Sequence, residues 1–290
     1  MNFPKLLFLR KNVTLKDRFS LISSMNECWA NVDGLKIRYL ESGKGAKKHV
    51  LFIHGLGSAA DRWMKIPDEL SSDFHSIAID LPGFGESDKP EKMNYTIDEF
   101  RKIIVSFLKE IPIQNEQINL IGHSLGGYIA SEIAIQNQNI VKQLVLIDSS
   151  GMLERPTPIL DEYFEAAMNP TQDNVRKAFE KMVADPKRIP QQLVDGFIRR
   201  VNMPNAKHAF ESTLVNSATT QIGLDRLRKI NPIPTLILWG VHDNVIPLEH
   251  SQFFKESIDD SRLEIIEDAG HAPFAEKPVQ VSELLKNFLF

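Results

Sequence analysis

Two kinds of apolar pattern alternate along the chain. Short continuous apolar runs, rich in Val, Ile and Leu, are typical of strands buried on both faces of a parallel sheet. Longer stretches with apolar residues at three- and four-residue spacing indicate amphipathic helices. The predicted strands are residues 36–40, 49–53, 76–79, 117–121, 143–147, 235–239 and 262–266, and the predicted helices are residues 97–110, 125–136 and 279–290. The first of these strands alternates instead, and we expect it to pair with an earlier strand. The pattern predicts an α/β fold with a mostly parallel sheet flanked by helices.

One interval carries helical periodicity alone. Residues 151–228 contain no strand-like run, and six prolines divide them into roughly four or five short helices, because proline stops a helix or sits in its first turn. An all-helical insertion cannot lie within the sheet layer, so we expect it to cover the edge where strand ends and loops converge. We call residues 151–228 the cap. The predicted organisation is an N-terminal extension (1–30) and a core (31–150 and 229–290) interrupted by the cap.

The strongest local motif lies between the predicted strand 117–121 and the helix that follows it. Residues 122–126 read Gly-His-Ser-Leu-Gly and match the pattern G-x-S-x-G. A serine on a tight strand-to-helix turn projects its hydroxyl beyond the sheet, and the flanking small residues let strand and helix approach. The helix N-terminus favours negative charge beside it. Ser124 is therefore the candidate nucleophile.

A nucleophilic serine needs a base and a group that orients the base. Of the eight histidines, His271 is the candidate base because it occupies a turn-rich loop between the last predicted strand and the final helix. Asp243 follows the strand 235–239, so its carboxylate can reach the same sheet edge as Ser124. Asp148, at the end of the preceding strand, is the alternative acid. Asp80 is interpreted as fixing a tight loop beside the site.

The loop after residues 49–53 is the candidate oxyanion site. Its sequence, His54-Gly55-Leu56-Gly57, contains glycines that permit turns aiming a backbone N–H inward. We expect the N–H groups of Leu56 and Leu125 to be the donors, with His54 bracing the loop.

Composition narrows the function classes. The chain is 42% hydrophobic and 25% charged with a net charge of −4, which fits a globular protein and gives no electrostatic reason to expect nucleic acid or anionic membrane as a partner. The single cysteine, Cys28, excludes an internal disulfide, and no apolar stretch is long enough to span a membrane. A cytoplasmic location is expected, although residues 1–24 are basic and mildly amphipathic, so a surface anchor is the alternative there. No Cys/His cluster or phosphate loop indicates a metal or organic cofactor. The oligomeric state stays open.

The motifs, their order and their strand contexts resemble the α/β-hydrolase superfamily over about residues 30–290. The chain order Ser124, Asp243, His271 is that of the superfamily. Residues 170–175, 185–186 and 206–210 also look like the cap of the carbon–carbon bond hydrolases that act on meta-cleavage products. Two positions depart from those enzymes: Ala272 stands where they usually carry tryptophan, and His123 stands where many have asparagine. Esterases and lipases of the superfamily fit better at both.

The resemblance implies a carboxylesterase or lipase-like serine hydrolase that works through an acyl-enzyme without a cofactor. We expect a small-molecule ester substrate with an apolar acyl or aromatic part. Its pocket is unassigned, and the cap candidates for lining it are Met168, Phe164 and Phe197. The alternatives are hydrolysis of a carbon–carbon bond or of a lactone by the same residues, and a non-catalytic ligand-binding member of the fold. Serine at the turn excludes the superfamily's epoxide hydrolases and haloalkane dehalogenases, which use aspartate there.

Overall fold

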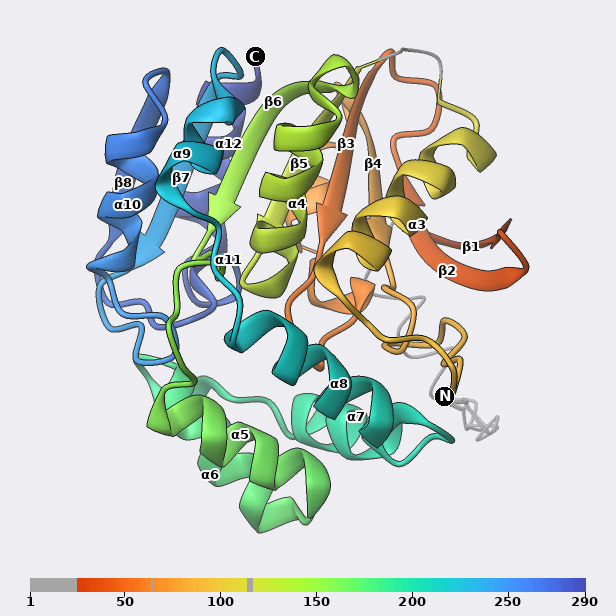
Figure 1. The fold of residues 1–290 in the computed structure, drawn as a ribbon, viewed down its shortest axis with the longest axis vertical. Coiled ribbons are helices and arrows are strands. Elements are labelled where there is room, and N and C mark those ends of the chain that lie inside the picture. The colour runs from red at the N-terminus through yellow and green to blue at the C-terminus, as the bar shows by residue number, and fades with distance from the viewer. Residues whose placement is uncertain (1–24, 64, 114–116) are drawn as a thin grey trace, which may run out of the picture.

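An eight-stranded sheet forms the centre of the molecule, in the order β1-β2-β4-β3-β5-β6-β7-β8 (Figure 1). The computed structural model describes residues 25–63, 65–113 and 117–290. The strands are β1 (Asn26–Val32), β2 (Leu35–Ser42), β3 (Lys48–Ile53), β4 (Phe74–Ile79), β5 (Ile118–His123), β6 (Val141–Ile147), β7 (Thr235–Gly240) and β8 (Ser261–Ile266). Strands β3 to β8 are parallel, whereas β2 pairs antiparallel with both β1 and β4 at one edge. The mostly parallel α/β sheet predicted from the sequence is confirmed.

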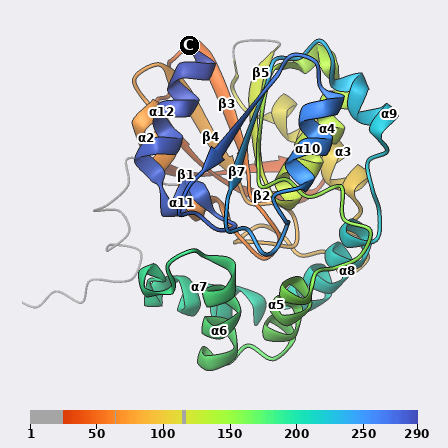
Figure 2. The ribbon, with the colours of Figure 1, turned by 90° about the vertical axis from the view of Figure 1, so that its left-hand side faces the viewer.

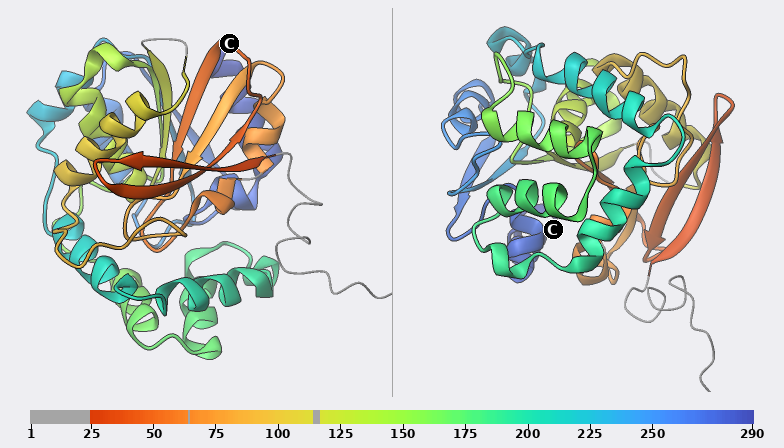
Figure 3. Two further views of the ribbon diagram at one scale, coloured as in Figure 1. Left: turned by 90° about the vertical axis from the view of Figure 1, so that its right-hand side faces the viewer. Right: turned by 90° about the horizontal axis from the view of Figure 1, so that it is seen from below.

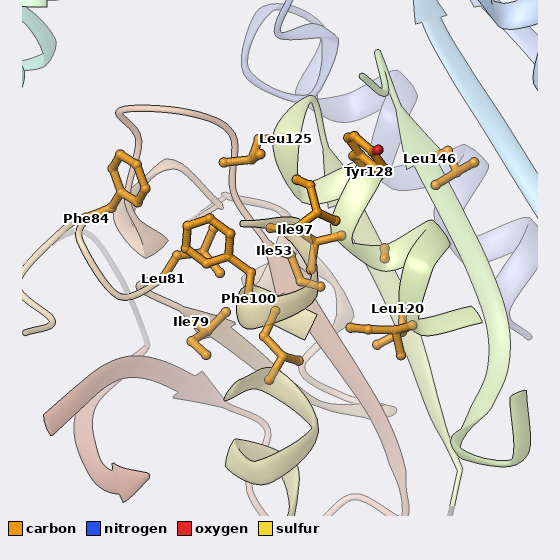
Figure 4. Packing of buried hydrophobic residues seen from close by; sticks show 14 of the residues in the cluster. Ile53, Ile79, Leu81, Phe84, Ile97, Phe100, Leu120, Leu125, Tyr128 and Leu146 are labelled. Carbon is orange, nitrogen blue, oxygen red and sulfur yellow. The ribbon is translucent and has the colours of Figure 1, made fainter. Parts of the chain in front are cut away.

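Helices cover both faces of this sheet (Figures 1 and 2). One face carries α3 (Ile97–Glu110), α4 (Leu125–Gln136), α9 (Leu224–Leu227) and α10 (His250–Ser257), and the other carries α2 (Lys65–Leu70), α11 (Pro273–Glu276) and α12 (Pro278–Leu289). Successive strand residues point to opposite faces, so each buried strand feeds two cores. In β3, Leu51 and Ile53 pack with the α3 and α4 side, whereas Val50 and Phe52 pack with α2 and α12. Figure 4 shows the first of these cores, to which Phe100 of α3, Tyr128 of α4, Ile53 of β3 and Leu120 of β5 all contribute.

The cap residues form helices without any strand in the described chain. They are α5 (Pro158–Met168), α6 (Gln172–Met182), α7 (Gln191–Val201), α8 (Ala206–Ala218) and the short α9. Local sequence explains where they begin: Thr157 and Thr171 each accept a backbone N–H of the following first turn, and Pro158 occupies the first turn of α5. Helices α5 to α8 lie across the C-terminal ends of the parallel strands (Figures 1 and 3). Helix α9 lies beside α4 and α10 on the face of the sheet, so these last residues of 151–228 do not cover the strand ends as expected.

The structure differs from the sequence-based expectations at a few boundaries. Strand β1 begins at Asn26, so the last residues of the segment predicted as an N-terminal extension (1–30) belong to the sheet. Helices α2 and α10 were not predicted. The possible surface anchor in residues 1–24 lies outside the described residues. Within the described chain, no helix combines the length and the apolar character needed to cross a membrane.

Candidate functional site

Ser124 occupies the sharp turn between β5 and α4. Its φ of 52° and ψ of −119° lie in a region that residues with a side chain rarely adopt, which is typical of strained functional turns. The turn is tight because α4 begins against the end of β3: a Cβ on Gly126 would lie 2.1 Å from the Ile53 carbonyl oxygen and 2.8 Å from that of His54. The Ser124 hydroxyl forms no hydrogen bond with a described residue. Hydrogen bonds of a reactive serine often form only when substrate is in place.

His271 and Asp243 form a buried pair beside this turn. Asp243 follows β7, His271 follows β8, and His271 Nδ1 lies 2.8 Å from Asp243 Oδ2. The other carboxylate oxygen of Asp243 accepts the N–H groups of Val245 and Ile246 at 2.8 and 3.0 Å, which fixes the acid's orientation. Because a carboxylate only accepts, the proton resides on Nδ1 of His271, and Nε2 is free to act as a base.

His123, which precedes Ser124, supports His271 through a hydrogen bond to its backbone. Its Nε2 lies 2.6 Å from the His271 carbonyl oxygen and must donate the proton of that hydrogen bond. Burial, together with the neighbouring His271, lowers the pKa of His123 well below its usual value, so the ring is neutral. The ring lies against Phe274 and Trp63, with centroids at 4.9 and 6.4 Å. No pattern in the sequence indicated this support of His271.

The cap contacts the same loop from the other side. The His271 N–H donates to the carbonyl oxygen of Met182, the last residue of α6, at 2.7 Å. Glu276 of α11 accepts the N–H of Ala184, which follows α6, at 2.8 Å and that of Gly270 at 3.0 Å. The loop that carries His271 is therefore fixed between core and cap. No sequence motif marks these contacts, because they depend on where the cap lies.

The two expected oxyanion donors have their N–H groups free. Neither the Leu56 nor the Leu125 N–H donates to a described residue; Leu125 is the first residue of α4, where the helix itself offers no partner. The Leu56 carbonyl, in contrast, accepts the hydroxyl of Tyr163 from α5 at 3.1 Å. Tyr163 was not predicted, and it links the orientation of this loop to the cap.

His54 braces the candidate oxyanion loop (residues 54–57) and Asp80 fixes the tight loop after β4, as the sequence suggested. The Asp80 carboxylate accepts the N–H of Ala60 at 2.6 Å and that of Glu86 at 2.8 Å. His54 Nε2 accepts the Leu81 N–H at 3.0 Å, so its other nitrogen, Nδ1, donates to the Gly55 carbonyl oxygen. Burial lowers the pKa of His54 and keeps it neutral for this role.

Asp148, the alternative acid, lies beside the His271–Asp243 pair. The partner of His271 Nδ1 is Asp243 and not Asp148. Asp148, Asp243 and His271 offer ligand-type atoms within 4.8 Å of one another, an arrangement that could be considered for a metal ion. However, both oxygens of Asp243 and Nδ1 of His271 are already engaged in hydrogen bonds. The cluster therefore fits a hydrogen-bonded acid and base better than a metal centre.

The three cap candidates for a substrate pocket occupy different environments. Phe197 is buried and borders a cavity of about 20 Å³ that Gly57 and Arg200 also line. Phe164 and Met168 are partly buried and pack against the main hydrophobic cluster. Their assignment to substrate contact stays a prediction.

Comparison with known proteins places the chain in a family. A family model for the alpha/beta hydrolase fold matches residues 48–278. The chain is 28% identical over 278 residues to the 2-hydroxy-6-oxo-6-(2'-aminophenyl)hexa-2,4-dienoic acid hydrolase of Metapseudomonas resinovorans, covering 92% of each protein. It is 28% identical over 261 residues to Lipase 1 of Psychrobacter immobilis, covering 88% of this chain and 81% of the lipase. The solved meta-cleavage product hydrolase of Pseudomonas fluorescens IP01 matches with a TM-score of 0.82 at 25% identity, over 90% of this chain and 97% of that one. The chain thus belongs to the alpha/beta hydrolase fold family, as its motifs predicted.

Proposed function

We propose that this protein is a serine hydrolase that cleaves carboxylic esters through an acyl-enzyme intermediate. The observation that carries the proposal is the buried His271–Asp243 pair, joined at 2.8 Å, beside Ser124 on its strained turn. A serine, a histidine with a free Nε2 and an orienting carboxylate are the components of nucleophilic acyl transfer.

Each group has a role in two half-reactions. Ser124 Oγ attacks the ester carbonyl while His271 Nε2 takes its proton, and Asp243 stabilises the resulting imidazolium. The N–H groups of Leu56 and Leu125 bind the oxyanion, each contributing about 3 kcal/mol to the transition state. His271 then gives its proton to the departing alcohol. In the second half-reaction His271 activates a water, which attacks the acyl-enzyme and releases the acid and Ser124.

An apolar substrate part is supported by the chemistry of the cap beside the oxyanion loop. The Tyr163 and Phe197 rings of α5 and α7 have centroids 5.4 Å apart, and each lies 5.2 to 6.4 Å from the rings of Phe179 in α6 and Phe210 in α8. Apolar and aromatic linings are typical of small-molecule sites. We therefore infer that the acyl or alcohol part of the ester is apolar, and that Phe197 is the first side chain to examine for contact with it.

The test compares two serine-to-alanine variants on hydrolysis of short p-nitrophenyl esters. Ser124→Ala removes the nucleophile and should reduce kcat/KM by at least about 10⁴-fold, because removal of a catalytic serine leaves only binding and oxyanion stabilisation. Ser131→Ala, on the same helix, loses a buried hydroxyl bonded only to the Gly127 carbonyl and should keep wild-type activity. Substantial turnover by Ser124→Ala would contradict the assignment of Ser124 as the nucleophile.

A second candidate is hydrolysis of a carbon–carbon bond with the same residues. It is favoured by the names of two relatives, a dienoic acid hydrolase and a meta-cleavage product hydrolase. Ala272 and His123 speak against it, since the resemblance to those enzymes fails at these two positions. A panel of p-nitrophenyl esters, lactones and one coloured meta-cleavage product distinguishes the two candidates. If the coloured compound is cleaved faster than any ester, carbon–carbon bond hydrolysis becomes the preferred function. Failure of a fluorophosphonate probe to label Ser124 would instead favour a non-catalytic member of the fold.

A further inference from the structure

A second buried carboxyl lies behind the His271–Asp243 pair. Asp148 directly follows β6 and is fully buried. Its backbone has a φ of 42°, which is rare outside glycine, and its N–H donates to the Leu238 carbonyl oxygen at 3.0 Å. Its Oδ1 accepts the N–H of Gly240 at 2.9 Å. The backbone and one oxygen thus hold the Asp148 side chain at the ends of β6 and β7.

The other oxygen of this carboxyl receives no proton donor from the protein. Asp148 Oδ2 is buried, no N–H or O–H of a described residue donates to it, and the carboxyl lies against that of Asp243; ligand-type atoms of Asp148, Asp243 and His271 lie within 4.8 Å of one another. A buried carboxylate without partners is costly, so the protonated acid is the favoured form. Burial and the adjacent charge of Asp243 accordingly raise the pKa of Asp148 well above its usual value. As a neutral acid, Asp148 presents an O–H donor toward the pair.

The other charged groups around Asp148 do not supply a free positive charge that would stabilise its ionised carboxylate. Asp243 faces it from the loop after β7, His271 from the loop after β8, and Glu276 from α11. Glu276 is occupied by the N–H groups of Ala184 and Gly270. Of these three groups, His271 alone can become a cation, and in the intact site that cation is paired with Asp243.

We propose that Asp148 is a reserve acid of the site: a positioning residue that supports Asp243 and takes over as the partner of His271 when the Asp243 carboxylate is removed. The inference rests on the proposed serine-hydrolase function. In the takeover, Asp148 loses its proton to solvent, and its carboxylate accepts the Nδ1–H of His271. No other group or co-reactant is needed.

The test is a double-mutant cycle on Asp148 and Asp243. Asp243→Ala alone should lose less than about 100-fold in kcat/KM, well short of the about 10⁴-fold loss typical when the orienting acid of such a site is disabled. Asp148→Asn alone keeps the acceptor for Gly240 and should lose less than about tenfold. The double variant should fall by at least about 10⁴-fold. Equal activity of Asp243→Ala and the double variant would show that Asp148 does not substitute.

A pH profile separates this role from a merely structural one. In Asp243→Ala the adjacent charge is removed but the burial of Asp148 remains, so activity should gain a dependence on the ionisation of Asp148 that the wild type does not have. This dependence should vanish in the double variant. A profile of Asp243→Ala that matches the wild type in shape and position would overturn the proposal. Because loss of Asp243 also frees the N–H groups of Val245 and Ile246, Asp243→Asn, which keeps their acceptor, is measured in parallel as a check on folding.

The readout is chosen so that this inference and the proposed function can fail separately. The rate at which a fluorophosphonate probe labels Ser124 reports the activated nucleophile without knowledge of the natural substrate. If the wild type neither labels nor hydrolyses esters, the proposed function fails. If the probe labels the wild type, but replacing Asp148 changes the labelling rate by the same factor with and without Asp243, only the proposed role of Asp148 is refuted.

Discussion

The loops that carry the site and the cap that covers them are stabilised in different ways. The loops after β3 and β4 are fixed by polar contacts: Asp80 alone accepts the N–H of Ala60, the N–H of Glu86 and the guanidinium of Arg38. The cap interior is instead a cluster of aromatic rings, centred on Tyr163, Phe197 and Phe210. Hydrogen bonds demand particular atoms in particular places, whereas apolar packing tolerates substitution of similar volume. The loops should therefore be the less forgiving region.

The largest expected effect follows from replacing Asp80 by asparagine. Arg38, which is nearly buried, would keep its ion pairs with Glu27 and Asp61. It would lose its ion pair with the fully buried carboxylate of Asp80. Breaking a buried ion pair from one side typically costs about 3–5 kcal/mol. Denaturant unfolding should show a loss of this size, together with reduced esterase activity because the oxyanion loop loses its anchor at Ala60. Asp173→Asn, on the exposed surface of α6, is the control and should leave the unfolding midpoint unchanged. Equal effects of the two changes would remove the contrast between loops and cap.

An intermediate effect is expected from Tyr163→Phe, which keeps the ring in the aromatic cluster and removes only the hydroxyl. The partly buried Leu56 carbonyl would lose its donor, and a hydrogen bond of this kind contributes about 0.5–1.5 kcal/mol. Because Leu56 supplies an oxyanion N–H in the proposed mechanism, kcat should fall by about tenfold with little change in KM. Tyr128→Phe loses a hydroxyl bonded to Thr220, which has no role in the proposed mechanism, and should keep kcat. If kcat of Tyr163→Phe stays at the wild-type value, the cap does not influence the oxyanion loop.

The smallest effect is expected on the outside of the cap. Lys181 of α6 pairs with Glu162 of α5, and both side chains are about half exposed. Exposed ion pairs contribute under about 1 kcal/mol and are screened by salt. Lys181→Ala should lower the free energy of unfolding by no more than that, with the difference disappearing in high salt and with unchanged esterase activity. A loss that persists in high salt would mean that the cap depends on charge more than its apolar interior suggests.

The sequence predicted those parts of the molecule that follow from short-range pattern. Continuous apolar runs located the parallel strands, and the turn around Ser124 was recognisable because its glycines, strand and helix are adjacent in the chain. His271 and Asp243 were found because both follow strands whose ends share one sheet edge. Asp148 meets the same criterion, so the sequence favoured Asp243 as the acid but kept Asp148 as the alternative. That choice depends on the turn at residues 243–246, where backbone N–H groups bind Asp243.

Other features depend on contacts between distant segments and carry no local signal. Tyr163 lies 107 residues from Leu56, and nothing in its surroundings distinguishes it from other aromatic residues of the cap. The support of His271 by Met182 is a backbone contact, to which side-chain identity contributes little. An earlier strand was expected to pair with residues 36–40, and β1 is that strand, but the sequence did not locate it because its residues alternate between exposed and partly buried positions at the sheet edge. Short helices such as α2 offer too few turns for a periodic pattern.

Among the hydrogen bonds that join the cap to the core, three reach the loops that carry the proposed reactive groups, each after a different strand. Tyr163 holds Leu56, the Thr157 hydroxyl donates to the Val245 carbonyl in the loop of Asp243, and Met182 accepts from His271. For protein engineering, this means that the cap is not an interchangeable module. A cap grafted from a relative to change substrate preference must reproduce these three attachments, or the recipient loses the alignment of its own reactive groups along with its old specificity.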